Sequence, residues 1–297
     1  MTIALLVALI VLVLAAFAPR SPPAWLSFAD WASGGGRGAE RVATAVPFGK
    51  HGQTLDVWAP EGATREARPV LVWLHGGGWV KGDRAAYAFA ARAFARAGYL
   101  VVVPDYRKVP QVRFPAFLVD GAEAVAWTQA NAARFGGDPD RIALSGHSAG
   151  AHTAVMLALD PRYLRSAGAD PTAIRAAIGL SGPYDFYPFD KKRSIDAMAA
   201  WPRPLETQPI AFARADAPPL LLVTSTRDET VRPKNAINLA ARMKEVGGRV
   251  RLENYEGLDH EEVVMALSKP FGGKGPVLAD SLAFLRDVGM APAAARP

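Results

Sequence analysis

Short apolar runs alternate along the chain with longer stretches whose apolar residues recur at helical spacing. Strands are expected at 54–58, 70–74, 100–103, 142–144, 174–180, 220–224 and 250–255, with helices at 85–97, 115–134, 149–159, 233–246 and 276–288. Strands that alternate with helices indicate βαβ units. The pattern therefore predicts an α/β fold: one domain with a mostly parallel central sheet and helices on both of its faces.

One interval, 180–220, breaks this alternation, because prolines interrupt it repeatedly. Connections of this length inside a compact domain commonly form lids or binding loops. We expect a lid-like insertion before the strand at 220–224. An irregular surface insertion without a role is the alternative.

The N-terminus has a different character. Residues 3–18 contain no polar side chain, which is short for a spanning helix of about 20 residues but suits a signal-peptide core of about 7–15 or a short anchor. The triplet Ala16-Phe17-Ala18 fits a cleavage site, whereas Pro19 directly after it disfavours cleavage. We expect residues 1–20 to be a signal or anchor segment, which makes the protein membrane-associated or exported to the periplasm or medium. A buried core helix is the alternative.

Composition sets the remaining boundaries. Residues 21–41 are rich in Pro, Gly and Ser, as linkers are, so we expect a linker there, the folded domain over 42–290 and an Ala-rich tail over 291–297. The net charge is +6, but the one dense basic run is Lys191-Lys192-Arg193, so no nucleic-acid partner is expected. The absence of cysteine excludes disulfides, thiolate metal sites and cysteine nucleophiles.

The sequence Gly146-His147-Ser148-Ala149-Gly150 joins an apolar strand to a helix. Glycines two residues before and after a serine leave room for a sharp turn, which lifts the hydroxyl above the sheet at a helix N-terminus. This motif is a weak signal by itself. It makes Ser148 the candidate nucleophile.

The sequence His75-Gly76-Gly77-Gly78-Trp79 directly follows the strand at 70–74. Three glycines let the backbone turn its amides toward a ligand, as an oxyanion requires. A phosphate-binding loop is the alternative, but neither glycine-rich phosphate motif is present.

The chain has five histidines that could serve as the base. We expect His147 to point away from its neighbour Ser148, and His152 to lie beside the strand rather than over it. His75 belongs to the glycine loop and His51 to an N-terminal hairpin. His260 follows the strand at 250–255, so it can meet Ser148 at the carboxyl edge of a parallel sheet, and it is the expected base.

An acid that orients the base is expected after the preceding strand. Asp228 follows the strand at 220–224 and precedes a helix, and a carboxylate there would hold the imidazole tautomer. Asp185 is the second candidate for this role. Glu229 would face differently, and Asp259 is too close to His260 to bridge to it.

These motifs, together with the segment DYRKVPQVRFPAFLVDGAEAV, resemble the α/β-hydrolase carboxylesterases: the branch of acetyl esterases, hormone-sensitive-lipase-like enzymes and kynurenine-formamidase-like proteins. The resemblance spans about 42–288. It implies the α/β-hydrolase fold, catalytic Ser148, Asp228 and His260, and an oxyanion hole formed by the amides of Gly77, Gly78 and Ala149.

Two departures narrow the branch that the chain resembles. His147 stands where many hormone-sensitive-lipase-like members carry an acidic residue, and their N-terminal helical cap is not expected here. Both features are closer to small acetyl and feruloyl esterases and formamidases. Asp105, Tyr106, Arg107 and Asp120 belong to the family's DYR…FP…D pattern and are expected to be structural, with an ion pair between Arg107 and Asp120.

The expected function is hydrolysis of short-chain carboxylic esters, which are small-molecule substrates, through an acyl-enzyme without a cofactor or metal. An arylformamidase or amidase is the second reading, a peptidase the third, and a non-catalytic binding protein of this fold the fourth. The oligomeric state is not predicted. In the insertion, aromatic side chains are expected to wall an apolar pocket over Ser148, and packing of the insertion itself is the alternative; these are Tyr184, Phe186, Tyr187, Phe189 and Trp201.

Overall fold

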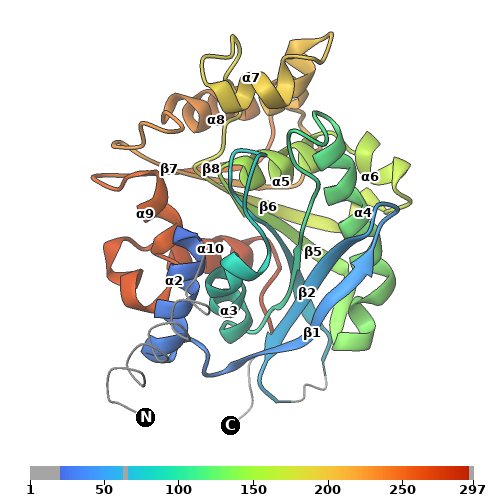
Figure 1. Cartoon of the computed structure of the whole chain (residues 1–297), viewed down its shortest axis with the longest axis vertical. Helices are drawn as coiled ribbons and strands as arrows, with labels where there is room; N and C mark the ends of the chain where they lie inside the picture. The colour runs from blue at the N-terminus through green and yellow to red at the C-terminus, as the bar shows by residue number, and fades with distance from the viewer. Residues whose placement is uncertain (1–20, 63–65, 294–297) are drawn as a thin grey trace, which may run out of the picture.

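The computed structural model describes residues 21–62 and 66–293, which fold around one eight-stranded sheet (Figure 1). The strand order is β1-β2-β4-β3-β5-β6-β7-β8. The strands are β1 (Ala39–Phe48), β2 (Gln53–Pro60), β3 (Arg68–Leu74), β4 (Leu100–Pro104), β5 (Gly137–His147), β6 (Ile174–Leu180), β7 (Leu220–Ser225) and β8 (Val250–Tyr255). Pairing is antiparallel between β1 and β2 and between β2 and β4, and parallel from β4 to β8. The prediction of a mostly parallel sheet is confirmed.

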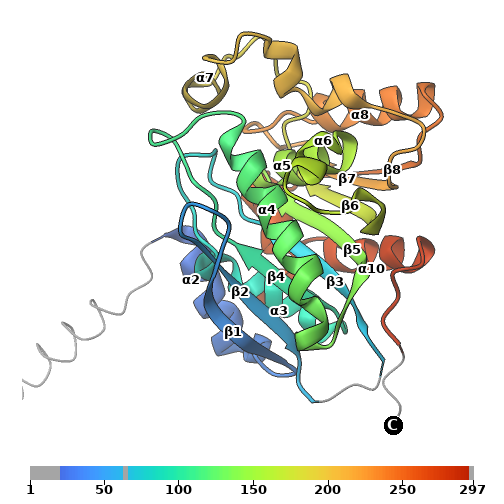
Figure 2. The same ribbon diagram turned by 90° about the vertical axis from the view of Figure 1, so that its right-hand side faces the viewer.

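Helices cover both faces of the sheet (Figure 2). One face carries α4 (Ala116–Asn131), α5 (Ala149–Leu159) and α8 (Lys234–Glu245), and the other carries α2 (Pro22–Asp30), α3 (Ala88–Arg96), α9 (His260–Met265) and α10 (Val277–Asp287). Two short helices, α6 (Arg162–Ser166) and α7 (Lys192–Met198), lie in connections. The layered arrangement agrees with the alternation of apolar runs in the sequence.

Strand β3 shows how the sheet divides the core. Val70, Val72 and Leu74 pack toward the α4/α5 layer, whereas Leu71 and Trp73 pack toward the α3/α10 layer, and all five side chains are fully buried. Successive side chains of a strand point to opposite faces, so a central parallel strand with helices on both sides must be apolar at every position. Truncation of such a side chain to alanine typically costs about 2–5 kcal/mol.

The segment expected to be a linker is folded and differs from that prediction. Ser21 caps α2 and accepts a hydrogen bond from the Ala24 N–H at 3.4 Å, and prolines occupy the first helical positions. Asp30, at the end of α2, is fully buried and accepts from Arg92 Nε at 2.7 Å. The π-helical turn η1 (Trp31–Gly35) and the start of β1 at Ala39 follow. The domain therefore includes residues that the Pro, Gly and Ser content had assigned to a linker.

The predicted signal or anchor segment, residues 1–20, lies outside the described residues. Within the part of the chain that the structure describes, no helix combines the length and the apolar character that crossing a bilayer requires. The insertion between β6 and β7 contains α7 and two short 3-10 turns, Pro204–Thr207 and Pro209–Phe212. In both Figure 1 and Figure 2, α7 lies at the end of the molecule remote from β1.

Candidate active site

Ser148 occupies a sharp turn between β5 and α5. Its backbone has φ 55° and ψ −120°, and residues other than glycine rarely adopt such a positive φ. A Cβ at Gly146 would lie 2.6 Å from the Leu74 carbonyl oxygen, and one at Gly150 would lie 2.0 Å from the same atom. Both flanking positions therefore require glycine, because the turn packs directly on the end of β3.

Three side chains meet at this turn. His260 Nε2 lies 2.9 Å from Ser148 Oγ, and His260 Nδ1 lies 2.9 Å from Asp228 Oδ2. With the proton on Nδ1, the imidazole donates to the carboxylate and accepts from the hydroxyl. Asp228 is 2% exposed and His260 5% exposed, so little water competes for these hydrogen bonds. The structure thus brings together the three residues that the sequence analysis selected.

The loops after β7 and β8 hold the acid and the base in place. Asp228 Oδ1 also accepts from the Val231 N–H at 2.8 Å, which orients the carboxylate toward His260. The other two acids face elsewhere. Asp185 accepts from Asn238 Nδ2 at 2.6 Å, and Asp259 caps α9 by accepting from the Glu262 N–H at 2.8 Å. Asp228 is the acid that contacts the imidazole.

Two of the remaining histidines, His75 and His152, are buried and bound to backbone carbonyls. His152 Nε2 donates to the Thr207 carbonyl at 2.8 Å, and His75 Nδ1 donates to the Gly76 carbonyl at 2.8 Å. Burial lowers the pKa of each to about 4, since a low-dielectric interior disfavours the charged ring. His51 is exposed in the β1–β2 turn. These three side chains make no contact with the Ser148 hydroxyl, in agreement with the prediction.

His147 has a role in the site that sequence reasoning missed. Its Nε2 donates to the His260 carbonyl at 3.0 Å, and the two rings lie 4.7 Å apart. Burial, and then the neighbouring His260, hold the pKa of His147 well below its usual value. The side chain of His147 thus binds the backbone of His260, the candidate base. No sequence pattern signals this contact, because the two residues are 113 positions apart in the chain.

The glycine loop after β3 lies beside the turn. Gly77 and Gly78 have φ 127° and 62°, and a Cβ at Gly77 would lie 2.1 Å from the Lys81 carbonyl oxygen. The hydroxyl of Tyr106, in the DYR segment, donates to the His75 carbonyl at 2.7 Å and so holds the start of the loop in place. In the described residues, the N–H groups of Gly77 and Gly78 donate to no carbonyl.

Charged residues of the DYR segment support this edge of the sheet. Arg107 and Asp120 form the expected ion pair, with Nη2 and Oδ1 2.7 Å apart. Asp105 binds Arg84, whose Nε also donates to Asp56 at 2.8 Å. The expected structural role of this segment is therefore confirmed for the Arg107–Asp120 pair.

Aromatic side chains of the insertion lie in two environments. Phe186 stacks on Trp79 of the glycine loop, with ring centroids 6.1 Å apart, and meets the edge of His152 at 5.8 Å. Trp201 packs on Phe114. Tyr184, by contrast, is fully buried in the core and does not wall a pocket, because its ring lies against Gly179 of β6 and Gly182 just after it. Arg193 of α7 reaches the other side of the glycine loop, where its Cδ would be 2.6 Å from a Cβ at Gly78.

Relatives among known proteins were found by sequence. The BD-FAE family model matches residues 55–243. The esterase LipC of Mycobacterium tuberculosis is 32% identical over 213 residues, which cover 65% of this chain and 53% of LipC. The isoprenylcysteine alpha-carbonyl methylesterase ICME of Arabidopsis thaliana is 25% identical over 266 residues, which cover 82% of this chain and 61% of ICME. The chain spans about half the length of the first curated relatives that it matches.

A solved structure shares the architecture. Thermogutta terrifontis esterase 2, phosphorylated by paraoxon, superposes with a TM-score of 0.71 at 24% identity, covering 86% of this chain and 96% of that one. At this identity the likeness establishes the fold. Together with the family match over more than half of the sequence, it shows that this chain has the α/β-hydrolase fold and belongs to the BD-FAE family.

Proposed function

We propose that this protein hydrolyses short-chain carboxylic esters, with Ser148 as nucleophile, His260 as base and Asp228 as the residue that orients the base. The observation that carries the proposal is the position of the His260 ring, with Nε2 2.9 Å from Ser148 Oγ and Nδ1 2.9 Å from Asp228 Oδ2. A serine hydroxyl is a weak nucleophile until such a base removes its proton. The names of relatives, such as esterase LipC and probable carboxylic ester hydrolase LipM, support ester substrates.

The first half of the reaction forms an acyl-enzyme. Ser148 Oγ attacks the ester carbonyl carbon while its proton passes to His260 Nε2, and the carbonyl oxygen becomes an oxyanion. Asp228 stabilises the imidazolium through Nδ1–H. The C–O bond to the alcohol then breaks, and His260 returns the proton to the departing alkoxide, so that an alcohol leaves.

The oxyanion needs hydrogen-bond donors close to Ser148. We assign the N–H groups of Gly77, Gly78 and Ala149 to this role. Gly77 and Gly78 supply amides without side chains that would screen them, and Ala149 begins α5, where N–H groups lack partners within the helix. Removal of one donor of this kind typically costs about 10²–10³ in kcat.

The second half of the reaction uses water. His260 Nε2 accepts a proton from a water molecule, whose oxygen attacks the acyl carbon and regenerates an oxyanion in the same place. Collapse of this intermediate breaks the bond to Ser148 Oγ, which takes its proton back from His260. The products are one carboxylic acid and one alcohol for each water consumed.

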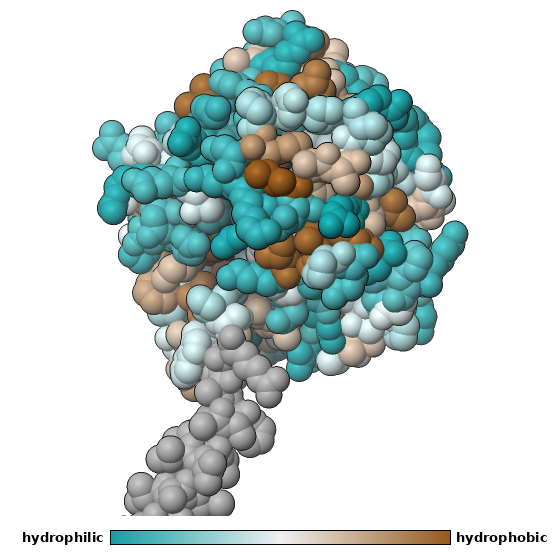
Figure 3. All heavy atoms as spheres, turned by 45° about the horizontal axis from the view of Figure 1, so that its top comes forward, coloured by the Kyte–Doolittle hydropathy of each residue, from teal (hydrophilic) through white to brown (hydrophobic). Residues whose placement is uncertain are grey.

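The short acyl length rests on the aromatic side chains near the glycine loop. Trp79 and Phe186 stack beside His152, and large rings leave less room for a long chain than aliphatic side chains do. Figure 3 shows apolar side chains gathered among hydrophilic ones on the face turned toward the α7 end. Phe186→Ala should shift the preference among acyl esters toward longer chains by about 10-fold, the scale of one or two methylenes.

Two measurements test the proposal. A fluorophosphonate probe should label the wild-type protein at Ser148 and leave Ser148→Ala unlabelled, and labelling elsewhere or not at all would contradict the nucleophile. A series of p-nitrophenyl esters from acetate to decanoate should show the highest kcat/KM at the short end. Feruloyl esters and N-formylkynurenine belong in the same series, and a higher kcat/KM on the formamide would replace esters as the substrate class.

We also propose that residues 3–18 direct the chain to a membrane or to export. Their uninterrupted apolar sequence is the support. Fractionation of cells that express the full chain should place it in the membrane or in an exported fraction. Recovery of the intact chain from the cytosol alone would contradict this targeting.

A further inference from the structure

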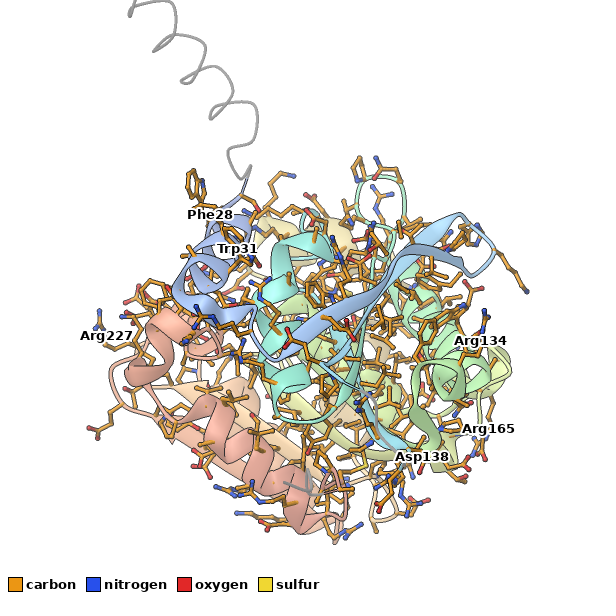
Figure 4. The ribbon with its side chains drawn as sticks, turned by 90° about the horizontal axis from the view of Figure 1, so that it is seen from below. Phe28, Trp31, Arg134, Asp138, Arg165 and Arg227 are labelled. Carbon is orange, nitrogen blue, oxygen red and sulfur yellow. The ribbon has the colours of Figure 1, made fainter. Side chains whose placement is uncertain are left out.

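Three large aromatic side chains stand exposed on one helix. Trp25 is 51% exposed, Phe28 50% and Trp31 62%. They recur every three residues, so they share one side of α2 and its continuation η1. Their rings contact in series, with centroids 6.1 Å apart for each neighbouring pair. Figure 4 shows Phe28 and Trp31 at the margin of the molecule, away from the sheet.

The exposure of these rings is not the result of a loosely held helix. The opposite side of α2 is anchored, because Ser27 Oγ donates to the Ala86 carbonyl at 2.8 Å and accepts from the Phe89 N–H at 3.1 Å. Asp30 pairs with Arg92 and also accepts from the Lys269 N–H at 2.8 Å. The helix is thus fixed to the domain in an orientation that keeps its aromatic side in solvent.

Cations lie beside η1, the turn that carries Trp31. A groove of about 540 Å³ runs between η1 and the 3-10 turn η7 (Lys269–Lys274), and its lining includes Arg37, Arg96 and Lys269 with the aliphatic Leu278 and Leu282 of α10. Arg96 donates to the Gly35 carbonyl. Among the described residues, the head groups of Arg37 and Lys269 have no acidic partner. We call Trp25, Phe28, Trp31, Arg37 and Lys269 the α2 surface.

We propose that the α2 surface docks on a lipid bilayer that contains anionic phospholipid. Tryptophan and other aromatic rings favour the headgroup region, where an apolar body and a polar edge are both accommodated. Each lysine or arginine near an anionic surface contributes about 1 kcal/mol. The position in the chain agrees, since α2 begins at Pro22, four residues after the apolar stretch 3–18 ends at Ala18.

Docking in this orientation leaves the reaction site accessible. The insertion helix α7 lies at one end of the molecule, apart from α2, in both Figure 1 and Figure 2. The groove lining does not include Ser148, Asp228 or His260. A bound domain therefore presents its site to substrates dissolved on the aqueous side, with α2 as a fixed contact beneath it.

Fluorescence quenching of the full chain on vesicles tests the proposal. The vesicles contain phosphatidylcholine and phosphatidylglycerol with brominated acyl chains, which quench only tryptophans that enter the bilayer. We expect quenching in the wild type and its loss in Trp25→Phe/Trp31→Phe, which keeps the apolar rings. Trp127→Phe, on α4, is the matched control and should retain the quenching. Two results would overturn the proposal: the chain binds vesicles without quenching, or the quenching survives in Trp25→Phe/Trp31→Phe. Either would show that the apolar segment or another surface makes the contact.

A second pair of variants tests the charge requirement. Arg37→Gln/Lys269→Gln should weaken the association by about fivefold for each charge removed, whereas Arg134→Gln/Arg165→Gln, on a different side of the molecule in Figure 4, should not. Equal effects of the two pairs would overturn the assignment of the cations. If the wild type self-associates without vesicles and Trp25→Phe/Trp31→Phe does not, the α2 surface binds a second copy of the chain instead.

Every variant should hydrolyse a water-soluble ester at the wild-type rate. This control separates a failure of the docking proposal from a failure of the proposed function.

Discussion

Two buried carboxylates, Asp228 and Asp30, have similar surroundings and different consequences. Asp228 is 2% exposed and binds His260 Nδ1 and the Val231 N–H. Asp30 is fully buried and binds Arg92 Nε and the Lys269 N–H. Each accepts one hydrogen bond from a basic side chain and one from backbone. The difference lies in the base, because imidazole gains and loses a proton near neutral pH and guanidinium does not.

This difference separates a pair that can work in a reaction from a pair that holds the fold. In the proposed reaction, a positive charge forms on His260 beside Asp228 when the Ser148 proton moves to it, and the charge is lost when the proton leaves. At Asp30 the charge on Arg92 is permanent, so the pair fastens α2 to α3. Burial and good geometry alone therefore do not identify a reactive carboxylate; the chemistry of its partner does.

The reactive side of the comparison is tested most strongly at the nucleophile. Ser148→Ala should reduce kcat on p-nitrophenyl acetate by about 10⁴–10⁶-fold with an unchanged melting temperature. Ser145→Ala, three residues earlier in β5, is the matched control, because its buried Oγ has no hydrogen-bond partner in the described structure. Comparable loss in both variants would mean that the turn is damaged rather than the chemistry.

At the acid, Asp228→Asn should lower kcat by about 10⁴-fold, since the amide cannot stabilise the imidazolium and favours the wrong tautomer. Asp185→Asn should stay within a few-fold of the wild type, because Asp185 faces Asn238. Steady-state kinetics of both variants provide the measurement. The reverse ranking would transfer the orienting role to Asp185.

On the structural side, Asp30→Asn should destabilise the fold by about 3–5 kcal/mol, since Arg92 then stays buried without its counter-charge. Urea denaturation of the wild type and the variant provides the measurement. Glu245→Ala, which removes the exposed pair with Arg242, should cost less than about 1 kcal/mol. The folded fraction of Asp30→Asn should retain full kcat, and a large kcat loss would mean that Asp30 serves the reaction.

Deletion of residues 1–40 should also destabilise the protein, because it removes α2 together with Asp30.

The neutral buried histidines give a smaller, pH-dependent effect. Burial lowers the pKa of His152 to about 4 in the folded state, against about 6.5 unfolded. Between these values the unfolded state binds a proton that the folded state does not, so stability falls as the pH drops from about 6.5 to 4, by about 3 kcal/mol.

His152→Gln should reduce that acid sensitivity, because the amide can still donate to the Thr207 carbonyl but does not titrate. Urea denaturation at pH 7 and pH 4.5 compares the variant with the wild type. His51→Gln, at an exposed position, should leave the pH dependence unchanged. Identical acid sensitivity in wild type and His152→Gln would place the proton uptake elsewhere.

Much of the fold followed from periodicity in the sequence. Strands buried on both faces, such as β3 and β4, are continuous apolar runs bounded by turns, and the predicted helices at 149–159 and 233–246 match α5 and α8 closely. Helix α2 is not predicted by composition, because the Pro, Gly and Ser content of residues 21–41 is typical of a linker. Ser21 followed by two prolines is a strong helix start, whereas the glycines within 34–38 are typical of a linker. The buried Asp30 could not be recognised without its partner Arg92.

The candidate site could be predicted for residues that end strands. Ser148, Asp228 and His260 follow β5, β7 and β8, and parallel strands bring their carboxyl ends to one edge. The contact from His147 to the His260 carbonyl could not be predicted, because it depends on how two loops pack. The aromatic character of Tyr184 predicts a place in the pocket, but its ring is fully buried against Gly182.

The positive φ of Ser148 has a consequence for selection. A non-glycine residue in this conformation costs on the order of 1–3 kcal/mol, and glycine at position 148 would adopt it without that cost. A sequence optimised only to remain folded would therefore place glycine here, between the glycines at 146 and 150. The serine is the less stable choice at this turn, and the reason to keep it is the hydroxyl that lies 2.9 Å from His260.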